Sequence, residues 1–384
     1  MHKPNTLLCT VGTSLFRPNL GLLHNNLAEG KVKEEIRPVA ERLVPAYAQK
    51  QWSEVASLLG ELPSSERLCG AEINSIASLL DKDYVSNNCG LFFFHSATED
   101  AHAIGQVLRQ YFAYRGHVPV ELVEVEGLQD NDPQQFRTHG LRNLAREMCR
   151  VIRDYSSDAC AINATGGYKA QIAIAVLLGQ ALGVPVYYKH EFFSEIIAFP
   201  PMPVSLDFEF WMRTSGMLFS LERAKDLVLA SEYEDEWDER CESLVERIDI
   251  DGEDYIELAA TGQIFHDTFR ERFRANRDQM LPPVVPPNKK KPPKCDHGHI
   301  AALKSLKRFL GKLIEEVPQV VYCRTDYHNP KLPKLNRFRL SRAEVKGLWS
   351  DGSETVGFVV ETLAETDSQK AAMVALLNEW LPEQ

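Results

Sequence analysis

The chain has 384 residues and a formal net charge of −11, and 44% of its residues are hydrophobic. This length exceeds what one hydrophobic core usually serves, so two or three domains are expected. No apolar run approaches the roughly 20 residues of a membrane span, and the N-terminus lacks a signal peptide's apolar stretch. We therefore expect a cytoplasmic protein without membrane contact. The eight cysteines form no CxxC pair, which argues against a disulfide framework and a zinc site.

The charge is distributed unevenly along the chain. From Lys289 to the C-terminus there are 16 Lys and Arg against 12 Asp and Glu, a net of +4, which leaves −15 for residues 1–288. A basic module attached to an acidic body is typical of a protein in which only one part meets a polyanion such as nucleic acid.

Residues 1–204 alternate short apolar runs with helical patterns, which indicates βα units around a mostly parallel sheet. The runs are dense in apolar residues and do not alternate strictly, so helices are expected on both faces. The predicted strands are Thr6–Gly12, Gly90–His95, Pro119–Val125, Ala159–Asn163, Pro185–His190 and Glu195–Phe199. We predict a Rossmann-like α/β domain.

Residues 205–280 predict a winged-helix-like connector. Helices near Trp211–Ala230 and Thr261–Arg274 flank a hairpin with its turn at Asp251-Gly252. The next segment, residues 281–295, contains LPPVVPPNKKKPPK, a composition that favours extended polyproline conformation and predicts a linker.

Residues 296–384 predict a small α+β domain. A helix over Ile300–Glu316 is followed by strands near Gln319–Thr325, Arg337–Leu340, Ala343–Ser350 and Glu354–Leu363, and a final helix over Asp367–Trp380.

Two predicted strands end in loops suited to a phosphate-bearing ligand. The first strand runs into TVGTSL and the fourth into NATGGYK. Open α/β sheets bind ligands at the carboxyl ends of their strands, where glycine lets backbone N–H groups approach an anion. Neither GxxxxGK[ST] nor GxGxxG is present, which argues against ordinary ATP or NAD binding.

The pair of loops resembles the CARF (CRISPR-associated Rossmann fold) family over roughly residues 4–204. The resemblance implies a homodimer that binds cyclic oligoadenylate, commonly the tetra- or hexa-adenylate, as an activator, with no other cofactor and no metal. Some members also cleave this ligand. The residues that match the family's two ligand loops are Gly12, Thr13, Ser14, Asn163, Thr165, Gly166, Gly167 and Lys169. A third contribution is expected from Ser96 and Thr98.

Members of this family usually control a fused effector. Three nuclease classes are candidates for the C-terminal domain. An Arg–His pair of the HEPN type is poorly matched by Arg324 and His328, because the region is rich in strands. The pattern of a metal-dependent PD-(D/E)xK site is matched by Asp326, Glu344 and Lys346. In such a site the carboxylates hold the metal and the lysine orients the attacking water.

The order of helix, strands, hairpin and helix resembles the RelE-like mRNA interferases, which act without a metal. Cleavage of this kind needs a base, an acid and cations around the phosphorane while the 2′-OH attacks. Arg337 and Arg339 alternate on one strand and therefore point to one face. The candidate catalytic residues are Arg337, Arg339, Lys331, Lys334, Tyr327 and His328.

The sequence therefore predicts a type III CRISPR effector in which cyclic oligoadenylate, expected to be the tetra-adenylate, activates an endoribonuclease. The expected substrate is mRNA on the ribosome. Two alternatives stay open: the PD-(D/E)xK nuclease, and a non-enzymatic regulator that binds DNA through the winged-helix-like part.

Overall fold

A computed structural model describes residues 3–129, 132–190, 193, 195–203, 205–224, 227–295, 303–328 and 335–381. The chain divides into two compact units, residues 1–205 and 206–384. Unit 1 and unit 2 are the names used below.

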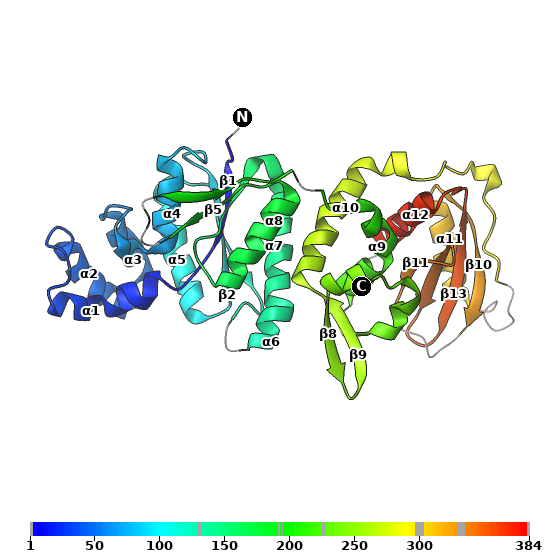
Figure 1. Ribbon diagram of the computed structural model, residues 1–384, viewed down its shortest axis with the longest axis horizontal. Coiled ribbons are helices and arrows are strands. Elements are labelled where there is room, and N and C mark those ends of the chain that lie inside the picture. Colours follow the sequence, from blue (N-terminus) through cyan, green and yellow to red (C-terminus); the bar gives the residue numbers. More distant parts are fainter. Residues whose placement is uncertain are drawn as a thin grey trace. The chain divides into compact units, whose positions relative to one another are not determined.

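Unit 1 is built on a six-stranded sheet in the order β3-β2-β1-β4-β5-β6 (Figure 1). The first five strands of this order are parallel, and β6 is antiparallel to β5. The mostly parallel sheet expected from the sequence is thereby confirmed. Its strands are β1 (Thr6–Thr10), β2 (Gly90–Ser96), β3 (Val120–Val125), β4 (Cys160–Asn163), β5 (Val186–Lys189) and β6 (Ile196–Phe199).

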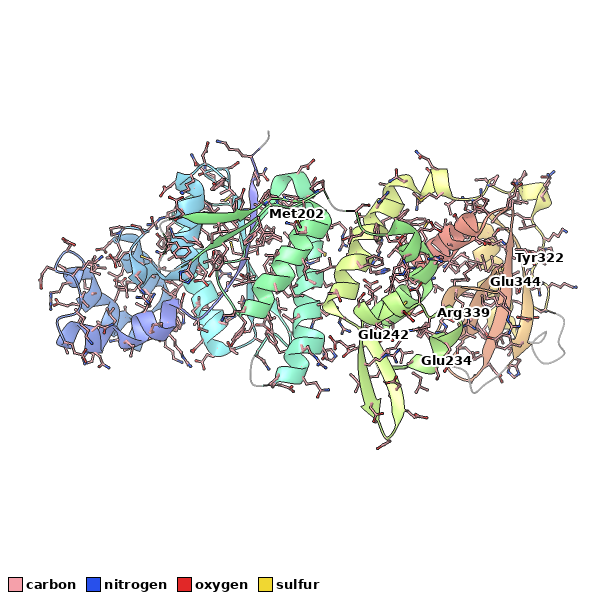
Figure 2. All side chains as sticks on the ribbon, in the orientation of Figure 1. Met202, Glu234, Glu242, Tyr322, Arg339 and Glu344 are labelled. Carbon is pink, nitrogen blue, oxygen red and sulfur yellow. The ribbon has the colours of Figure 1, made fainter. Side chains whose placement is uncertain are left out.

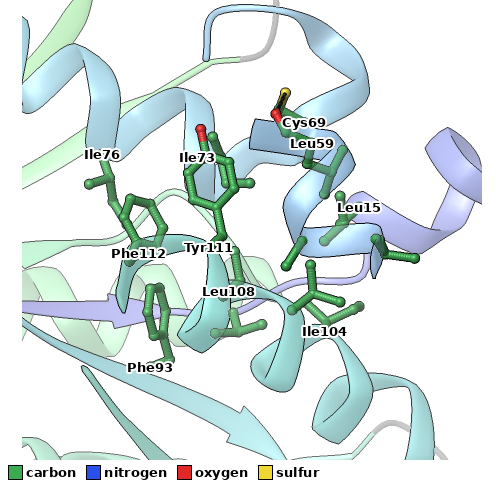
Figure 3. Packing of buried hydrophobic residues seen from close by; sticks show 14 of the residues in the cluster. Leu15, Leu59, Cys69, Ile73, Ile76, Phe93, Ile104, Leu108, Tyr111 and Phe112 are labelled. Carbon is green, nitrogen blue, oxygen red and sulfur yellow. Dashed lines mark hydrogen bonds between the residues drawn. The ribbon is translucent and has the colours of Figure 1, made fainter. Parts of the chain in front are cut away.

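Helices cover both faces of this sheet (Figure 1). The first face is covered by elements from the long connection between β1 and β2 together with α5, and Figure 3 shows Phe93 of β2 beside Phe112 and Leu108 of α5. Of these helices, α4 (Gly70–Asp81) and α5 (Glu99–Ala113) lie against the strands. The helices α1 (Gly21–Ala28), α2 (Arg37–Ala48) and α3 (Trp52–Gly60) pack outside them. The other face carries α7 (Leu141–Tyr155) and α8 (Lys169–Leu182), after the short α6 (Pro133–Gln135).

Unit 2 contains two antiparallel sheets. The smaller has the order β7-β9-β8 and the larger the order β10-β13-β12-β11. The strands are β7 (Val228–Leu229), β8 (Val245–Ile250), β9 (Glu253–Leu258), β10 (Val320–His328), β11 (Arg337–Ser341), β12 (Glu344–Ser350) and β13 (Thr355–Thr362). The helices are α9 (Phe208–Arg223), α10 (Ala260–Met280), α11 (Lys304–Glu316) and α12 (Asp367–Trp380).

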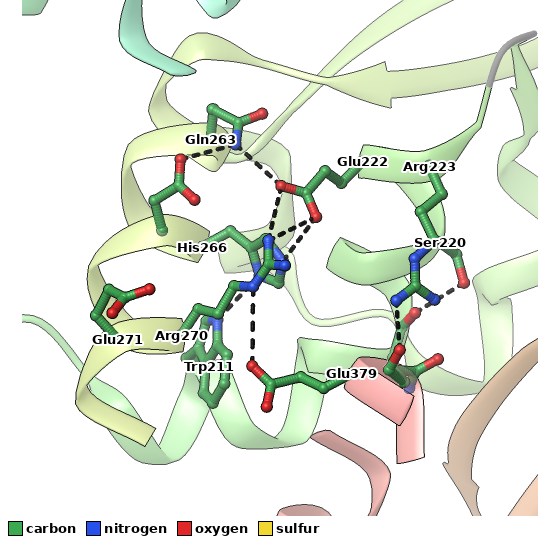
Figure 4. A network of polar contacts seen from close by, with 12 residues as sticks. Trp211, Ser220, Glu222, Arg223, Gln263, His266, Arg270, Glu271 and Glu379 are labelled. Atoms are coloured by element: carbon green, nitrogen blue, oxygen red, sulfur yellow. Dashed lines mark hydrogen bonds and ion pairs between the residues drawn. The ribbon is translucent and has the colours of Figure 1, made fainter. Parts of the chain in front are cut away.

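The expected connector and the expected C-terminal domain share one core. Ala371, Ala372 and Ala375 of α12 pack among apolar side chains of α9 and α10. A buried charged network joins the same three helices (Figure 4): Arg270 of α10 lies 3.1 Å from Glu222 of α9 and 3.8 Å from Glu379 of α12. Residues 206–280 are therefore part of the body of unit 2.

The same network sets the ionisation of Glu222. Burial alone would raise the pKa of this carboxyl, but His266, at 3.6 Å, and Arg270 outweigh burial and bring the pKa down to about 2. A carboxylate held between the Arg270 guanidinium and the His266 ring requires α9 and α10 to keep a fixed register.

The proline- and lysine-rich segment 281–294 differs from the expected free linker. Lys291 N–H donates to the carbonyl of Val321 at 2.9 Å, Lys294 N–H donates to Cys323 at 2.8 Å, and Lys294 forms a parallel bridge with Arg324. The segment therefore lies along β10. Extended polyproline geometry is close to that of a strand, and the lysines supply the N–H groups that proline lacks.

We expect Val285→Ala to destabilise unit 2, because Val285 is only 2% exposed and its N–H donates to Pro318. Removing two buried methyl groups should lower the free energy of unfolding by about 1–3 kcal/mol. The neighbouring Val284, 61% exposed, provides the matched control, and Val284→Ala should change little. Denaturant unfolding followed by tryptophan fluorescence measures both variants, since Trp211, Trp237, Trp349 and Trp380 lie in unit 2. Equal stabilities of the two variants would show that the segment is not packed.

Candidate ligand and nuclease sites

The two predicted ligand loops of unit 1 meet at the carboxyl edge of the sheet. β1 and β4 are parallel neighbours, so the loops that follow them leave the sheet side by side. Thr10 Oγ1 donates a hydrogen bond to the carbonyl of Gly166 at 2.6 Å. A Cβ atom on Gly12 would lie 2.7 Å from the nitrogen of Gly167, and one on Gly166 would lie 2.5 Å from the carbonyl of Thr10. The glycines thus allow the two backbones to touch.

Among the predicted ligand residues, Thr13 and Lys169 have exposed side chains, and Ser14 and Thr165 are half-buried. Ser14 Oγ accepts a hydrogen bond from the N–H of Ala71 at 3.1 Å, which ties the first loop to α4. Lys169 is the first residue of α8 and is exposed, so it adds a positive charge to the N-terminus of that helix. Both features suit an anion at this edge.

Asn163 is buried and does not face solvent. Its side-chain amide donates to Ser75 at 2.8 Å and its carbonyl oxygen accepts from Thr165 at 2.7 Å. Thr165 in turn accepts from the N–H of Lys189 at 3.0 Å. Asn163 therefore fixes the orientation of Thr165 and does not itself present a surface to a ligand.

Ser96 is the last residue of β2, the neighbour of β1 in the sheet, and Thr98 lies two residues after it. Thr98 Oγ1 accepts from the N–H of Ala101 at 3.3 Å and so caps α5, and the two hydroxyl oxygens lie 3.1 Å apart. These hydrogen bonds place both residues near the same edge, in a helix-capping role.

The structure adds residues that the sequence did not point to. A cavity of about 70 Å³ lies beside the two loops, next to the start of α4. Its lining combines three basic side chains with small polar ones: Ser14, Asn19, Arg67, Asn74, Thr165, Lys189 and His190, together with Pro18, Gly70 and Ala71. Because α4 belongs to the connection between β1 and β2, no local motif signals its approach to the loop after β4.

Glu72 of α4 is buried at the junction of the two loops. One carboxyl oxygen accepts the N–H of Gly12 at 2.7 Å, and the other is buried without a hydrogen-bond partner. Burial raises the pKa of Glu72 to about 7, although the bond from Gly12 acts in the opposite direction. Near neutral pH this carboxyl is therefore divided between its neutral and charged forms.

We expect Glu72→Gln to abolish a fall in stability of unit 1 with rising pH. The pKa of the folded carboxyl, about 7, lies above the ordinary value of 4.5, so between these two values only the unfolded chain loses the proton. The free energy of unfolding then decreases as pH rises from 4.5 to 7, by about 3 kcal/mol in total. Gln cannot ionise and keeps an acceptor for Gly12. Hydrogen exchange of β1 in urea at pH 5 and pH 8 measures the effect, and parallel pH profiles for the two proteins would contradict it.

In unit 2 one face of the four-stranded sheet packs on helices, and the opposite face carries charged side chains. Phe338, Trp349 and Phe358 pack with α11 and α12. Strand alternation places the residues between them on the opposite face, here called the charged face. The register aligns Arg324, Val359, Lys346 and Arg339 in one row across it. Figure 2 labels Tyr322, Glu344 and Arg339 on three of these strands.

Positively and negatively charged side chains alternate across the charged face and form ion pairs. Lys346 Nζ lies 2.9 Å from Asp326 and 3.7 Å from Glu344. Arg324 lies 2.7 Å from Glu344 and 3.1 Å from Glu361. The three residues of the metal-dependent alternative are thus brought together, with both carboxylates engaged by cations. Within the described ranges, no group of three or more His, Cys, Asp or Glu is arranged to hold a metal ion.

Tyr327 and His328 end β10 in different environments. A Cβ atom on Gly357 would lie 2.4 Å from the Tyr327 ring, so this ring lies over the glycine. Tyr327 is 37% exposed. His328 Nε2 lies 2.5 Å from a carboxyl oxygen of Glu354. Tyr327 is therefore available for stacking on a base, and His328 is held by a carboxylate. Lys331 and Lys334 lie outside the described residues.

Arg337 differs from the expectation that it contacts the scissile phosphate. It is only 6% exposed, its Nη1 lies 3.3 Å from Glu232, and its guanidinium stacks on Tyr233 with 4.8 Å to the ring centre. Both partners belong to the 3-10 helix Ala230–Glu236, about 105 residues earlier in the chain. Arg339, two residues further along β11, is only half-buried. Strand alternation correctly put both side chains on one face but could not show that a distant segment covers one of them.

We expect Glu232→Ala to destabilise unit 2 by about 3 kcal/mol, because the Arg337 charge stays buried without its carboxylate. The double variant Glu232→Ala with Arg337→Met should recover most of this loss, since no unpaired charge remains. Denaturant unfolding followed by tryptophan fluorescence yields the coupling energy. Additive effects of the two single substitutions would show that the two side chains do not interact.

The sequence model of a family described as CRISPR-associated protein (Cas_APE2256) matches residues 67–202. This part of the chain is similar in sequence to that family. The match spans α4, with Glu72, and every strand from β2 to β6, with the loop Asn163–Lys169. It supports a CRISPR-related role for the protein. No curated protein matches the chain. In the described part of the chain, no helix has both the length and the apolar character that crossing a membrane requires.

Proposed function

We propose that the protein is a CRISPR effector in which unit 1 senses cyclic oligoadenylate and unit 2 cleaves RNA in response. The observation that carries the sensor proposal is the meeting of the loops Gly12–Ser14 and Asn163–Lys169 at the carboxyl edge of a parallel sheet. The family match over residues 67–202 and the resemblance to CARF domains both support this assignment.

In the proposed sensor, Lys169 and the first N–H groups of α8 receive a phosphodiester, and the hydroxyls of Thr13, Ser14 and Thr165 receive further ligand oxygens. Arg67 and Lys189 add positive charge from the neighbouring cavity. If the ring is also cleaved, the same hydroxyls and Lys169 would position its 2′-OH. Ser96, Thr98 and Asn163 act through the architecture of the site and not by direct contact.

A cyclic ligand with repeated phosphates suits a two-fold site, so we propose a homodimer through unit 1. Leu177 of α8, Ile197 and Phe199 of β6, and Met202 are apolar and 37% to 58% exposed. The amide side chain of Gln180 on α8 bonds both Pro200 and Met202, at 3.2 and 2.8 Å, and joins α8 to the segment after β6. A second copy of the chain is the occupant proposed for this surface.

In the proposed effector, the charged face of unit 2 receives RNA. The 2′-OH attacks the adjacent phosphorus, its proton passes to a base, and the 5′-oxygen leaves with a proton from an acid. Tyr327 is proposed for base stacking and Arg339 for the charge of the phosphorane. His328, oriented by Glu354, is paired across the strands with Val356 and so lies on the opposite face at the end of β10. It is proposed for proton transfer to RNA that passes around this end of the sheet. Arg337 would join them only after release from Glu232. Ribosome-bound mRNA remains the proposed substrate on the RelE-like resemblance.

A second candidate, the PD-(D/E)xK nuclease, is favoured by one observation: Lys346 lies within 3.7 Å of both Asp326 and Glu344. For that chemistry a divalent metal would have to displace Lys346 and Arg324 from the two carboxylates. The metal-free reaction needs no such displacement, and we therefore prefer it.

The experiment combines the purified full-length protein with cyclic tetra-adenylate or hexa-adenylate, using free RNA and translating ribosomes as parallel substrates. We expect cleavage only with one of these ligands, undiminished by EDTA. Lys169→Ala should raise the ligand concentration for half-activation at least tenfold. Arg339→Ala should bind ligand normally and cleave at least tenfold more slowly, since it removes one charge-assisted contact to the phosphate.

Arg308, an exposed residue of α11, provides the control for Arg339, and Arg308→Ala should cleave as the wild type does. Loss of cleavage in EDTA would establish the metal-dependent candidate instead. Ligand-dependent binding to DNA without RNA cleavage would refute the enzyme proposal and favour the winged-helix regulator.

A further inference from the structure

The strand that carries Arg337 and Arg339 lies at the edge of its sheet. Among the residues that the structure describes, β11 pairs with β12 and with no other strand. The N–H and carbonyl of Phe338 point away from β12 and are buried, so both need partners. An unpaired edge in this position would leave the direction of both arginine side chains poorly fixed.

Asn378 of α12 supplies both missing partners. Its side-chain carbonyl accepts the N–H of Phe338 at 3.1 Å, and its side-chain amide donates to the carbonyl of Phe338 at 2.8 Å. The same amide donates to Val374 at 2.9 Å, and the side chain is completely buried. One amide side chain thus takes the place of a further strand at the residue between Arg337 and Arg339.

Helix α9 contacts the same edge of β11. A Cβ atom on Gly216 would lie 2.6 Å from the carbonyl oxygen of Phe338 and 3.3 Å from Cα of Arg339, so α9 touches the edge of β11 directly. Arg223 at the end of α9 donates to the backbone carbonyl of Asn378. Figure 4 shows Arg223 reaching from α9 to α12. The contacts of Asn378 with the backbone of Phe338, here called the amide clamp, are therefore supported by α9 as well as α12.

We infer that Asn378 is a positioning residue for RNA cleavage, which sets the arginines of β11 on the charged face by holding the backbone of Phe338. This inference rests on the proposed ribonuclease function. An amide offers a donor and an acceptor side by side, as the two groups of Phe338 require. Aspartate would keep the bond from the N–H and face the carbonyl with negative charge, and alanine would leave both groups unpaired.

The test compares Asn378→Ala and Asn378→Asp with Thr366→Ala in the full-length, ligand-activated protein. Thr366 caps the N-terminus of the same helix α12, at the end opposite Asn378, and its hydroxyl accepts from the N–H of Gln369 at 3.2 Å. Its substitution weakens α12 without removing the amide clamp. The readouts are kcat and KM for RNA, the melting temperature, and hydrogen exchange of residues 335–341.

Both Asn378 variants should lower kcat at least tenfold with KM within twofold of wild type, and should accelerate exchange over residues 335–341. Thr366→Ala should lower the melting temperature yet keep kcat and this exchange within twofold. Equal losses of kcat in Thr366→Ala and Asn378→Ala, or unchanged exchange in β11 after Asn378→Ala, would overturn the inference. If the wild type cleaves no RNA, the proposed function fails, and the exchange measurement still decides whether Asn378 holds β11.

Discussion

Unit 1 depends on the backbone contact between the loop after β1 and the loop after β4. Gly12 and Gly166 allow the two loops to touch, and Thr10 joins them with a hydrogen bond to Gly166. The buried Glu72 carboxyl accepts the N–H of Gly12 at the same junction. Any side chain on these glycines would push the loops apart and separate Thr13 from Lys169. The geometry of the proposed ligand site is thus a consequence of close packing, and the glycines contribute to it without needing to touch a ligand.

In unit 2, too, contacts between distant parts of the chain are decisive. Here they supply hydrogen-bond partners to the two edges of the four-stranded sheet. The proline-rich segment lies along β10 at one edge, and Asn378 completes β11 at the other. On the charged face between them, Glu232 and Tyr233 cover Arg337. Because α9 follows unit 1 directly in the chain and touches β11 at Gly216, a change at the start of unit 2 would reach the arginines through few contacts.

Much of the fold was accessible from local patterns. Dense apolar runs predicted all six strands of unit 1, because buried parallel strands need apolar residues on both faces. The turn Asp251-Gly252 was found in the hairpin β8–β9, since both residues adopt positive φ there. For segment 281–294 the composition predicted an extended linker. Apart from the 3-10 turn Pro287–Lys289, the segment instead lies along β10. Its composition could not show this, because the partner strand lies about 30 residues later in the chain.

The sequence by itself determined the strands, the two glycine loops and the pairing of Arg337 with Arg339 on one face, because each follows from residues close together in the chain. Only the tertiary structure decided that Glu72 lies under the loops, that Asn163 is buried, that Arg337 is covered by Glu232, and that Asn378 holds Phe338. Each of these contacts joins residues 40 to 105 positions apart. Such partners are brought together by packing of the whole unit, which leaves no periodic signal in the sequence.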